Sequence, residues 1–392
     1  MVDQPVASRR DPAHVVDLFA GPGGLDVAAH WLGLHVDGIE WDPAARKTRK
    51  AANLPTAPTG DVRELSPGHY PSAGILAGGP PCQTYTVAGS GAGRKALDQV
   101  KKFAMRMEYD ECGVGEDLRS LADERTALVL EPLRWILEAD RDGDPFHTIV
   151  LEQVPTVRPV WKEYHGILKR LGYSADYDVL NTEQFGVPQT RRRAILIASR
   201  DRHVTLPQPT HARYRKGVPS SDLPAGGLEP WVSMGQALRK RSRPFEVISN
   251  YGTGGDPKKR GRRDSSMPAA TVTGKILRNR VFEGGQEAKR FDVHEAGRLQ
   301  TFPLDYPWQG KDQAQQVGNA IPPRLAVHVL AAALGFKVDD EVLDATVDGE
   351  WKRTSKEKPL ANELPITHNT PGRVGNDAYT QDVSAEPVTM PS

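Results

Sequence analysis

The sequence contains only two cysteines, Cys82 and Cys112, among its 392 residues. Two thiols cannot form the disulfide framework of a small secreted protein, so we expect a reducing cytoplasm. Long apolar runs are also lacking: the longest, Leu325 to Phe336, covers 12 residues and contains His328. Since a bilayer span needs about 20 apolar residues, we expect a packed helix and no membrane contact. The first dozen residues do not predict a secretory signal.

Net charge is almost absent, at +1 from 51 Lys and Arg against 50 Asp and Glu, and it therefore indicates no partner. The charge is unevenly distributed. Residues 202–290 hold 18 basic against 7 acidic residues, an excess of +11, whereas residues 338–392 hold 5 basic against 11 acidic. A basic block in a neutral chain is typical of a module that contacts phosphates, although a solvated basic face is the alternative.

Apolar segments of strand length alternate with helical patterns over the first 200 residues. Runs such as His14 to Ala20, Thr148 to Glu152 and Arg193 to Ser199 predict buried strands. This alternation predicts an α/β fold with a mostly parallel sheet and helices on both faces. After residue 200, prolines, glycines and basic runs replace the periodic pattern, which predicts a smaller, loop-rich domain.

The first chemical signal is a strand that ends in a glycine-rich turn, DLFAGPGG at residues 17–24. Its glycines allow the backbone to approach a nucleotide-like ligand and the next helix to pack closely. Pro22 removes one backbone donor, so the turn is a poor phosphate cradle. On spacing alone, an ordinary tight turn is equally consistent.

An acidic residue at the end of the second predicted strand favours the ligand interpretation. Glu40 lies 16 residues after Gly24, where a carboxylate can accept hydrogen bonds from ribose hydroxyls. Trp41 offers a flat face for an adenine, and Asp61 lies where a third strand is expected to end. Together they indicate an adenosyl ligand without phosphates. A core-edge Trp and a capping Asp are the simpler alternatives.

Three further motifs place reactive side chains at strand ends. Two prolines fix the backbone ahead of Cys82, whose thiol is a candidate nucleophile, with an inert buried Cys as the alternative. Glu152 ends another buried strand and is a candidate general acid. Alternation predicts that Arg191 and Arg193 lie on one side of the following strand, where each needs an anionic partner.

In this order, eight motifs resemble the motif set of the DNA cytosine-5 methyltransferases: DLFAGPGG, IEWD, GDV, GGPPCQ, LEQV, GVPQTRRR, RLQTFP and QVGNAIPP. The resemblance implies the Rossmann-like fold of S-adenosylmethionine-dependent methyltransferases. It also implies three parts: a catalytic, S-adenosylmethionine-binding domain at 13–200, a small target-recognition domain at 201–311, and a segment at 312–337 that returns to the catalytic domain. The polar, acidic composition of residues 338–392 predicts a flexible tail.

The resemblance further implies a mechanism. Cys82, as thiolate, adds to carbon 6 of a cytosine that is flipped out of the duplex, and Glu152 protonates ring nitrogen 3. Arg193, with Arg191 as a further candidate, positions the base and the carboxylate. Carbon 5 takes the methyl group of S-adenosylmethionine, which leaves S-adenosylhomocysteine. The implied cofactor pocket consists of Phe19, Gly21, Gly23, Gly24, Leu25, Glu40, Trp41, Asp61, Val62, Pro80, Asn319 and Ala320.

The chemistry implied by the resemblance requires no metal, and the sequence presents no cluster of His or Cys that predicts one. One departure from the family pattern is Gln153, where an Asn usually helps to fix the Pro-Cys loop. Gln adds a methylene and a rotor, so the same hydrogen bond is possible but less pre-organised. We expect activity to survive at a lower rate.

The implied partner is double-stranded DNA, with a restriction endonuclease that acts on the same site as an open option, and we expect a monomer. Two alternatives compete. A non-catalytic DNA-binding homologue would lose Cys82, Glu152 or the arginines, all of which are present. A methyltransferase acting on transfer RNA shares the early motifs but usually has a distinctive small domain, which this sequence does not present.

Overall fold

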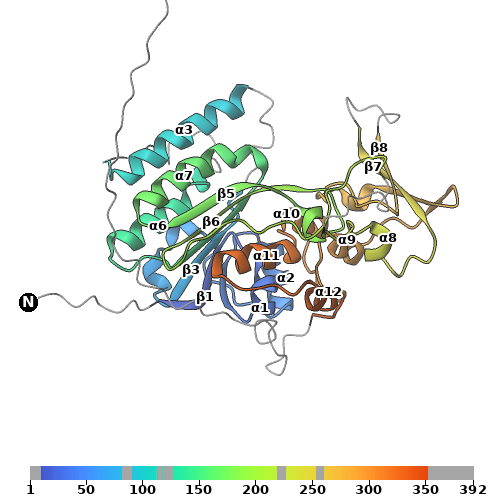
Figure 1. The fold of residues 1–392 in the computed structure, drawn as a ribbon, viewed down its shortest axis with the longest axis horizontal. Helices are drawn as coiled ribbons and strands as arrows, with labels where there is room; N and C mark the ends of the chain where they lie inside the picture. Colours follow the sequence, from blue (N-terminus) through green and yellow to red (C-terminus); the bar gives the residue numbers. More distant parts are fainter. Residues whose placement is uncertain are drawn as a thin grey trace, which may run out of the picture.

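The computed structural model describes residues 10–81, 91–111, 113, 117, 127–218, 227–252 and 260–351. Two sheets organise these residues, a large one in the first half of the chain and a small one in the basic block (Figure 1). The large sheet has the strand order β2-β1-β3-β4-β6-β5. Its strands are β1 (Asp11–Leu18), β2 (His35–Ile39), β3 (Ala73–Gly78), β4 (Thr148–Gln153), β5 (Ser174–Asn181) and β6 (Arg192–Ser199).

The large sheet is mostly parallel, as predicted. Strands β1 to β4 pair in parallel, whereas β6 lies between β4 and β5 and is antiparallel to both. Strand β3 (AGILAG) is buried along its whole length, as expected of a central strand that is covered on both faces. Because β6 is antiparallel, it begins at the edge of the sheet where β1 to β4 end.

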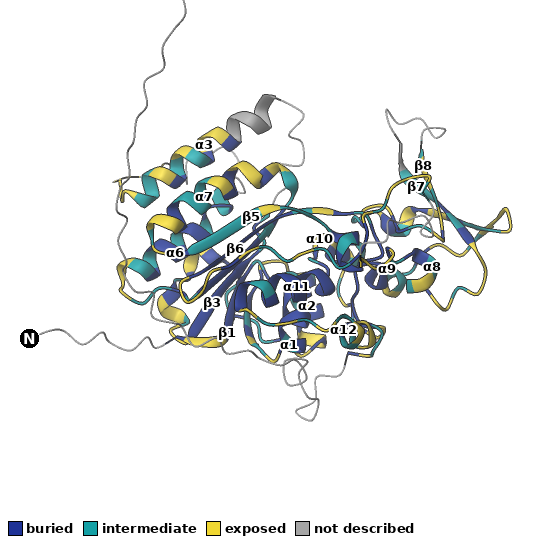
Figure 2. Cartoon of the chain, viewed as in Figure 1, coloured by how far each residue is buried: buried dark blue, intermediate teal, exposed yellow. Residues whose placement is uncertain are grey.

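Helices cover both faces of this sheet, and Figure 2 shows the buried residues concentrated between them. One face carries α3 (Gly91–Glu108), α6 (Glu131–Arg141) and α7 (Arg158–Arg170), and the other carries α1 (Gly24–Trp31) and α11 (Pro323–Leu334), with α2 (Pro43–Ala51) beside them. Trp135 and Trp161 are fully buried on the first face, whereas Val27 and Leu325 are fully buried on the second.

The small sheet is antiparallel, with the order β10-β9-β7-β8. Its apolar side chains, including Phe245, Val247 and Val281, belong to the same buried cluster as Leu325 of α11. The two sheets therefore share one continuous core. The elements of this region are α8 (Met234–Ala237), β7 (Phe245–Gly252), β8 (Arg260–Asp264), β9 (Arg280–Glu283), β10 (Gln286–Ala288) and α9 (Val293–Leu299).

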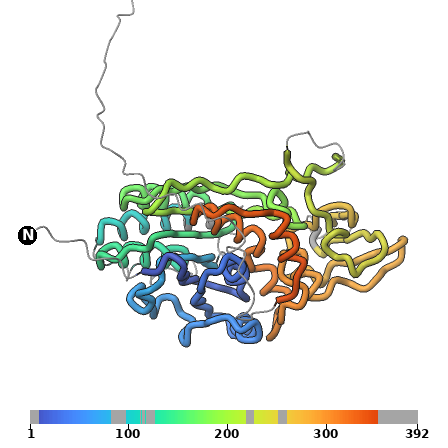
Figure 3. The backbone as a smooth tube through the Cα atoms, turned by 60° about the horizontal axis from the view of Figure 1, so that its bottom comes forward, coloured from blue at the N-terminus to red at the C-terminus, as the bar shows by residue number. Residues whose placement is uncertain are grey.

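After the small sheet, the chain returns to the large one through α10 (Gln313–Asn319) and α11, as the orange and red tube of Figure 3 shows. The stretch Gln313–Leu334 is long and apolar enough to cross a membrane, but 78% of its most apolar window is buried inside the protein. Helix α11 packs against α1, β4 and β6. It is therefore a core helix, as the sequence predicted.

The expectation of a flexible tail from residue 338 is wrong for its first part. Residues Asp340–Val347 form helix α12, whose Leu343 is fully buried. Arg324 of α11 pairs with Asp340 at 2.9 Å and with Asp344. Two of the acidic residues that suggested a solvated tail, Asp340 and Asp344, are thus ion-pair partners of the buried Arg324. Residues 352–392 lie outside the described residues.

A buried ion pair joins α1 to α2 beneath the glycine-rich turn. The guanidinium of Arg49 donates two hydrogen bonds of 2.8 Å to the carboxylate of Asp26, and both side chains are almost completely buried. Arg49 also donates to the Pro55 carbonyl at 2.8 Å. Since a buried carboxylate without its partner is costly, this pair ties the two helices firmly together.

We predict that Arg49→Met lowers the free energy of unfolding by about 3–5 kcal/mol, because Asp26 is left charged and buried. Urea unfolding followed by circular dichroism measures this change. The matched control is Arg280→Met in the exposed Arg280–Glu287 pair, which is expected to change stability little. If Asp26→Leu combined with Arg49→Met is no more stable than Arg49→Met alone, the unpaired charge is not the cause.

Candidate active site

A cavity of about 620 Å³ opens where β1, β2, β3 and β4 end and β6 begins. Residues that follow these strands line it, together with residues 315–321 of the returning segment. Ligands of doubly wound folds bind at this edge of the sheet, and the volume is that of a small-molecule site. All of the predicted cofactor residues except Gly23 line the cavity, as do Glu152 and Arg193.

The glycines of the turn after β1 are required by close packing. Gly23 has φ +106°, and a Cβ there would lie 2.3 Å from Leu54 Cδ1. A Cβ on Gly24 would lie 2.3 Å from the carbonyl oxygen of Ile321 in the returning segment. The two glycines therefore allow the turn to pack against Leu54 and against the returning segment at Ile321. Gly23 is needed for this packing and does not line the cavity.

Glu40 fastens the end of β2 to the turn after β1. Its two carboxylate oxygens accept hydrogen bonds from the backbone N–H groups of Gly21 and Asp42, each at 2.6 Å. Burial raises the pKa of Glu40 above its usual value, although both hydrogen bonds oppose the shift. Trp41 beside it is 68% exposed, so most of its indole is available at the cavity.

Asp61 reaches the cavity in a different way from the one predicted. The described residues before it form no third strand, only a bridge between Gly38 and Thr56. Asp61 instead caps a short 3-10 helix (Val62–Glu64) and pairs with Arg63 at 2.7 Å. The hydrogen bond from Arg63 lowers the pKa of Asp61. Asp61 therefore both caps this 3-10 helix and lines the cavity.

Sequence reasoning did not name Asp17 as a site residue, although it lines the cavity at the end of β1. It is 3% exposed, and burial, reinforced by the nearby Asp26, raises its pKa well above the usual value. A cationic ligand group beside it would offset this desolvation. The available signal was a carboxylate in an otherwise apolar strand, directly before the glycine turn.

Glu152 and Arg193 meet on the cavity wall, as the sequence predicted. Arg193 Nε forms an ion pair with Glu152 Oε1, and both side chains are mostly buried, at 12% and 15% exposed. Antiparallel pairing of β4 and β6 brings the end of one strand to the beginning of the other. A carboxylate held by a guanidinium is thereby oriented toward the space where a ligand binds.

Gln153 ties β4 to the loop that leads to the predicted nucleophile. Its side-chain amide donates to the carbonyl of Pro80, and its amide oxygen accepts from the N–H of Val154. The expected hydrogen bond to the Pro-Cys loop is thus present with Gln. The described chain continues to Pro81, which lines the cavity, and Cys82 lies outside the described residues.

The two predicted arginines occupy different surroundings. Arg191 is 1% exposed, and its guanidinium donates to the carbonyls of Val272 at 2.9 Å and Gly318 at 2.8 Å. Arg193 lines the cavity, and Arg191 does not appear among its described lining residues. Through these two hydrogen bonds, Arg191 joins the turn before β6 to the small domain and to the returning segment.

Gln189 completes this junction and was missed by sequence reasoning. Its amide nitrogen donates to the Leu299 carbonyl at 2.9 Å, and its amide oxygen accepts from the Val272 N–H at 3.0 Å. Gln300, which is also fully buried, donates to the Val317 carbonyl at 2.7 Å. The motifs GVPQTRRR, RLQTFP and QVGNAIPP therefore meet through buried amides.

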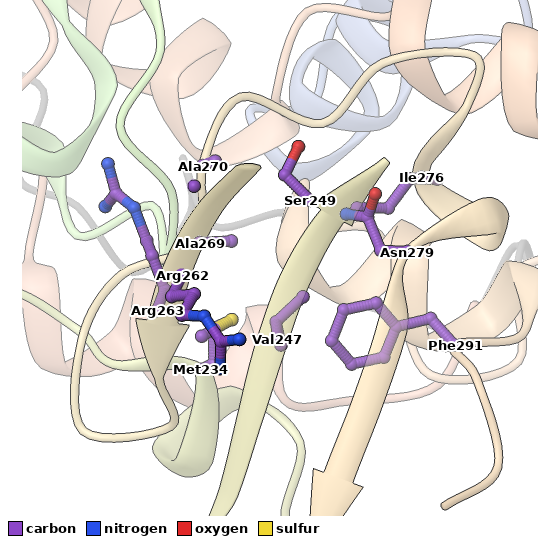
Figure 4. Close-up of a pocket in the computed structure, with 11 residues that line it drawn as sticks. Met234, Val247, Ser249, Arg262, Arg263, Ala269, Ala270, Ile276, Asn279 and Phe291 are labelled. Carbon is purple, nitrogen blue, oxygen red and sulfur yellow. The ribbon is translucent and has the colours of Figure 1, made fainter. Parts of the chain in front are cut away.

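A second cavity, of about 210 Å³, lies in the small domain (Figure 4). Figure 4 shows Ser249 and Asn279 near each other, with Arg262 on the opposite wall and apolar side chains such as Phe291 below. Hydroxyl, amide and guanidinium groups are the types that read base edges. The lining of this cavity thus combines polar and apolar side chains.

The basic block serves packing as well as surface charge. Arg263 donates to Thr190 Oγ1 at 2.9 Å and to the Pro268 carbonyl at 2.8 Å, so it joins the small domain to the large sheet. Arg262 beside it is 63% exposed and pairs with Glu246 at 2.9 Å. Within the basic run, Arg263 therefore serves packing, whereas Arg262 lies on the surface.

We predict that Glu40 and Asp61 titrate on opposite sides of their ordinary pKa values, Glu40 above and Asp61 below. The free energy of unfolding then falls as pH rises from the ordinary glutamate pKa through the raised pKa of Glu40. The contribution of Asp61 is present above the ordinary aspartate pKa and is lost as pH falls through its lowered pKa. Carboxyl ¹³C NMR titration, assigned with Glu40→Gln and Asp61→Asn, measures both; a Glu40 pKa at its ordinary value would contradict the burial argument.

Comparison with known proteins agrees with this geometry. The sequence profile of the C-5 cytosine-specific DNA methylases matches residues 13–104 and 119–334. The chain is 27% identical over 354 residues to the type II methyltransferase M1.HphI of Haemophilus parahaemolyticus, covering 83% of this chain and 87% of that protein. It is 29% identical over 304 residues to the type II methyltransferase M.NgoBI of Neisseria gonorrhoeae, covering 74% and 83%.

A solved structure shares the fold. The S. pombe Dnmt2 methyltransferase superposes with a TM-score of 0.54 at 14% identity, covering 82% of this chain and 98% of that one. The sheet topology, the cavity at its carboxyl edge and a profile match over most of the chain lead to one assignment. The chain belongs to the family of C-5 cytosine-specific DNA methylases.

Proposed function

We propose that this DNA cytosine-5 methyltransferase uses Cys82 as its nucleophile, Glu152 as the acid at ring nitrogen 3 of cytosine, and Arg193 to orient Glu152. The Glu152–Arg193 pair on the cavity wall carries this proposal. The route of the chain supports it further, since Pro80 and Pro81 line the cavity immediately before Cys82 and Gln153 holds the Pro80 carbonyl.

The proposed chemistry follows from the electronics of cytosine. Carbon 5 is a poor nucleophile until the thiolate of Cys82 adds to carbon 6, which forms a carbon–sulfur bond and moves electron density toward carbon 5. Protonation of nitrogen 3 by Glu152 stabilises this adduct. S-adenosylmethionine supplies the methyl group that carbon 5 takes up. Loss of the carbon 5 proton to a water base, departure of the Cys82 thiolate and return of the nitrogen 3 proton to Glu152 then release 5-methylcytosine.

The cavity lining fits an adenosyl sulfonium cofactor. Each oxygen of Glu40 accepts one backbone hydrogen bond, so lone pairs remain for ribose hydroxyls. The exposed indole of Trp41 offers a stacking face for adenine, and Asp61 is a further acceptor. Asp17 supplies the carboxylate that a positively charged ligand needs. The remaining proposed contacts are Phe19, Gly21, Gly24, Leu25, Val62, Pro80, Asn319 and Ala320.

The small domain is proposed to face double-stranded DNA. Its exposed basic side chains would neutralise phosphates, and polar groups such as Ser249, Arg262 and Asn279 are candidates for reading base edges. The target cytosine must leave the helix to reach the cavity, at a cost of a few kcal/mol of stacking and pairing. Since the relatives are named type II methyltransferases, we also propose a cognate restriction endonuclease.

We predict that Cys82→Ala abolishes transfer of tritiated methyl groups to DNA while DNA binding, measured by fluorescence anisotropy, is retained. The matched control is Cys112→Ala, which removes the other thiol and is expected to remain active. Near-normal methylation by Cys82→Ala would refute the covalent mechanism. Competition between DNA and RNA substrates in the same assay tests the substrate class, and bisulfite sequencing of DNA from expressing cells identifies the target site.

We also predict that Gln153→Leu lowers the single-turnover rate by roughly 10²-fold, because the loop that presents Cys82 loses its hydrogen bond at Pro80. Gln153→Asn keeps an amide and is expected to remain close to the parent rate. Binding of S-adenosylhomocysteine, measured by calorimetry, is expected to stay unchanged in both variants. A Leu variant as fast as the parent would show that the hydrogen bond does not position the loop.

A further inference from the structure

A group of metal-ligating side chains lies at the edge of the large sheet opposite the cavity. His14 of β1 and His35 of β2 are directly paired across the parallel strands, so their side chains share one face. Asp37 lies two residues after His35 and therefore points to the same face. One ligand atom from each of the three residues lies within 4.8 Å of the others.

In the His14–His35–Asp37 cluster, both histidines contact the same carboxylate. His14 Nε2 is 2.9 Å from Asp37 Oδ2, and His35 Nε2 is 3.8 Å from Asp37 Oδ1. Donors that lie about 2.0–2.2 Å from a tetrahedral zinc ion are separated by about 3.3 Å, which falls between these two distances. The two imidazoles thus approach different oxygens of one carboxylate.

A second contact fixes the orientation of the inner histidine. His14 Nδ1 is 2.9 Å from Ser72 Oγ, and the His14 side chain is 11% exposed. Metal-binding histidines usually donate their other ring N–H to an acceptor in this way, which leaves the second nitrogen for the ion. His35, at 54% exposed, and Asp37, at 31%, leave the cluster open to solvent.

We propose that His14, His35 and Asp37 bind a divalent transition metal ion of the zinc class, with water in the remaining position. Two imidazoles and one carboxylate suit zinc, whereas magnesium and calcium prefer oxygen ligands alone. The ion would join β1 to β2 at their amino ends. His14 and His35 lie five residues, about 16 Å of strand, before Phe19 and Glu40, and Asp37 lies about 10 Å before Glu40, so the cluster is distinct from the methyl-transfer site and independent of the proposed mechanism.

Zinc binding to chelator-treated protein tests the proposal, measured by competition with a chromophoric chelator and by the zinc-dependent shift in Tm. We expect a single equivalent to bind and to raise the Tm. His35→Ala and Asp37→Ala are expected to weaken binding by at least about tenfold, and Ser72→Ala by about tenfold through the orientation of His14. Cobalt bound in place of zinc is expected to show visible d–d absorption that His35→Ala removes.

The matched control is His294→Ala, which removes an exposed histidine that lies close to Asp292 but has no second histidine beside it in the described structure. This variant is expected to bind zinc like the parent protein. Equal zinc affinity in the parent and in His35→Ala would overturn the proposal, as would zinc binding that disappears only when Cys82 and Cys112 are both replaced by Ala. Methyl transfer is expected to persist in the chelator-treated enzyme below its Tm.

Discussion

The hydrogen bonds of Gln189 and Arg191 hold together the three parts of the chain that build the active site. These buried side chains lie just before β6 and bind backbone groups of Val272 and Leu299 in the small domain and of Gly318 in the returning segment. Each partner is a backbone group that burial would otherwise leave without a hydrogen bond. The position of the cavity wall therefore depends on a polar junction inside an apolar core.

This junction explains how residues far apart in the sequence form one site. The cavity needs strand ends from the first 200 residues and residues 315–321 from the returning segment, and Gly24 allows Ile321 to approach closely. A continuous core beneath both sheets fixes the small domain against the large one. The basic block takes part in this packing through Arg263, so part of its charge serves the structure of the domain.

Local patterns predicted the elements well. Helix α11 and the strands β1, β4 and β6 follow from apolar runs, because burial of one face or of both faces imposes them. Local sequence patterns gave wrong predictions where a segment is stabilised by residues distant in the sequence. The acidic segment after residue 338 forms α12 because Arg324 pairs with Asp340 and Asp344. No strand forms before Asp61 in the described residues, and the Asp61 side chain instead caps a 3-10 helix.

The sequence alone determined the family, the order of the motifs and the candidate reactive groups, since each motif is a short run whose chemistry is local. Only the tertiary structure decided which groups meet. It paired Glu152 with Arg193, assigned Arg191 to the junction, brought Asp17 into the cavity and joined His14 to His35 and Asp37. The physical reason is that contacts between distant segments depend on strand order and on the packing of the whole core, and no local run of residues encodes them.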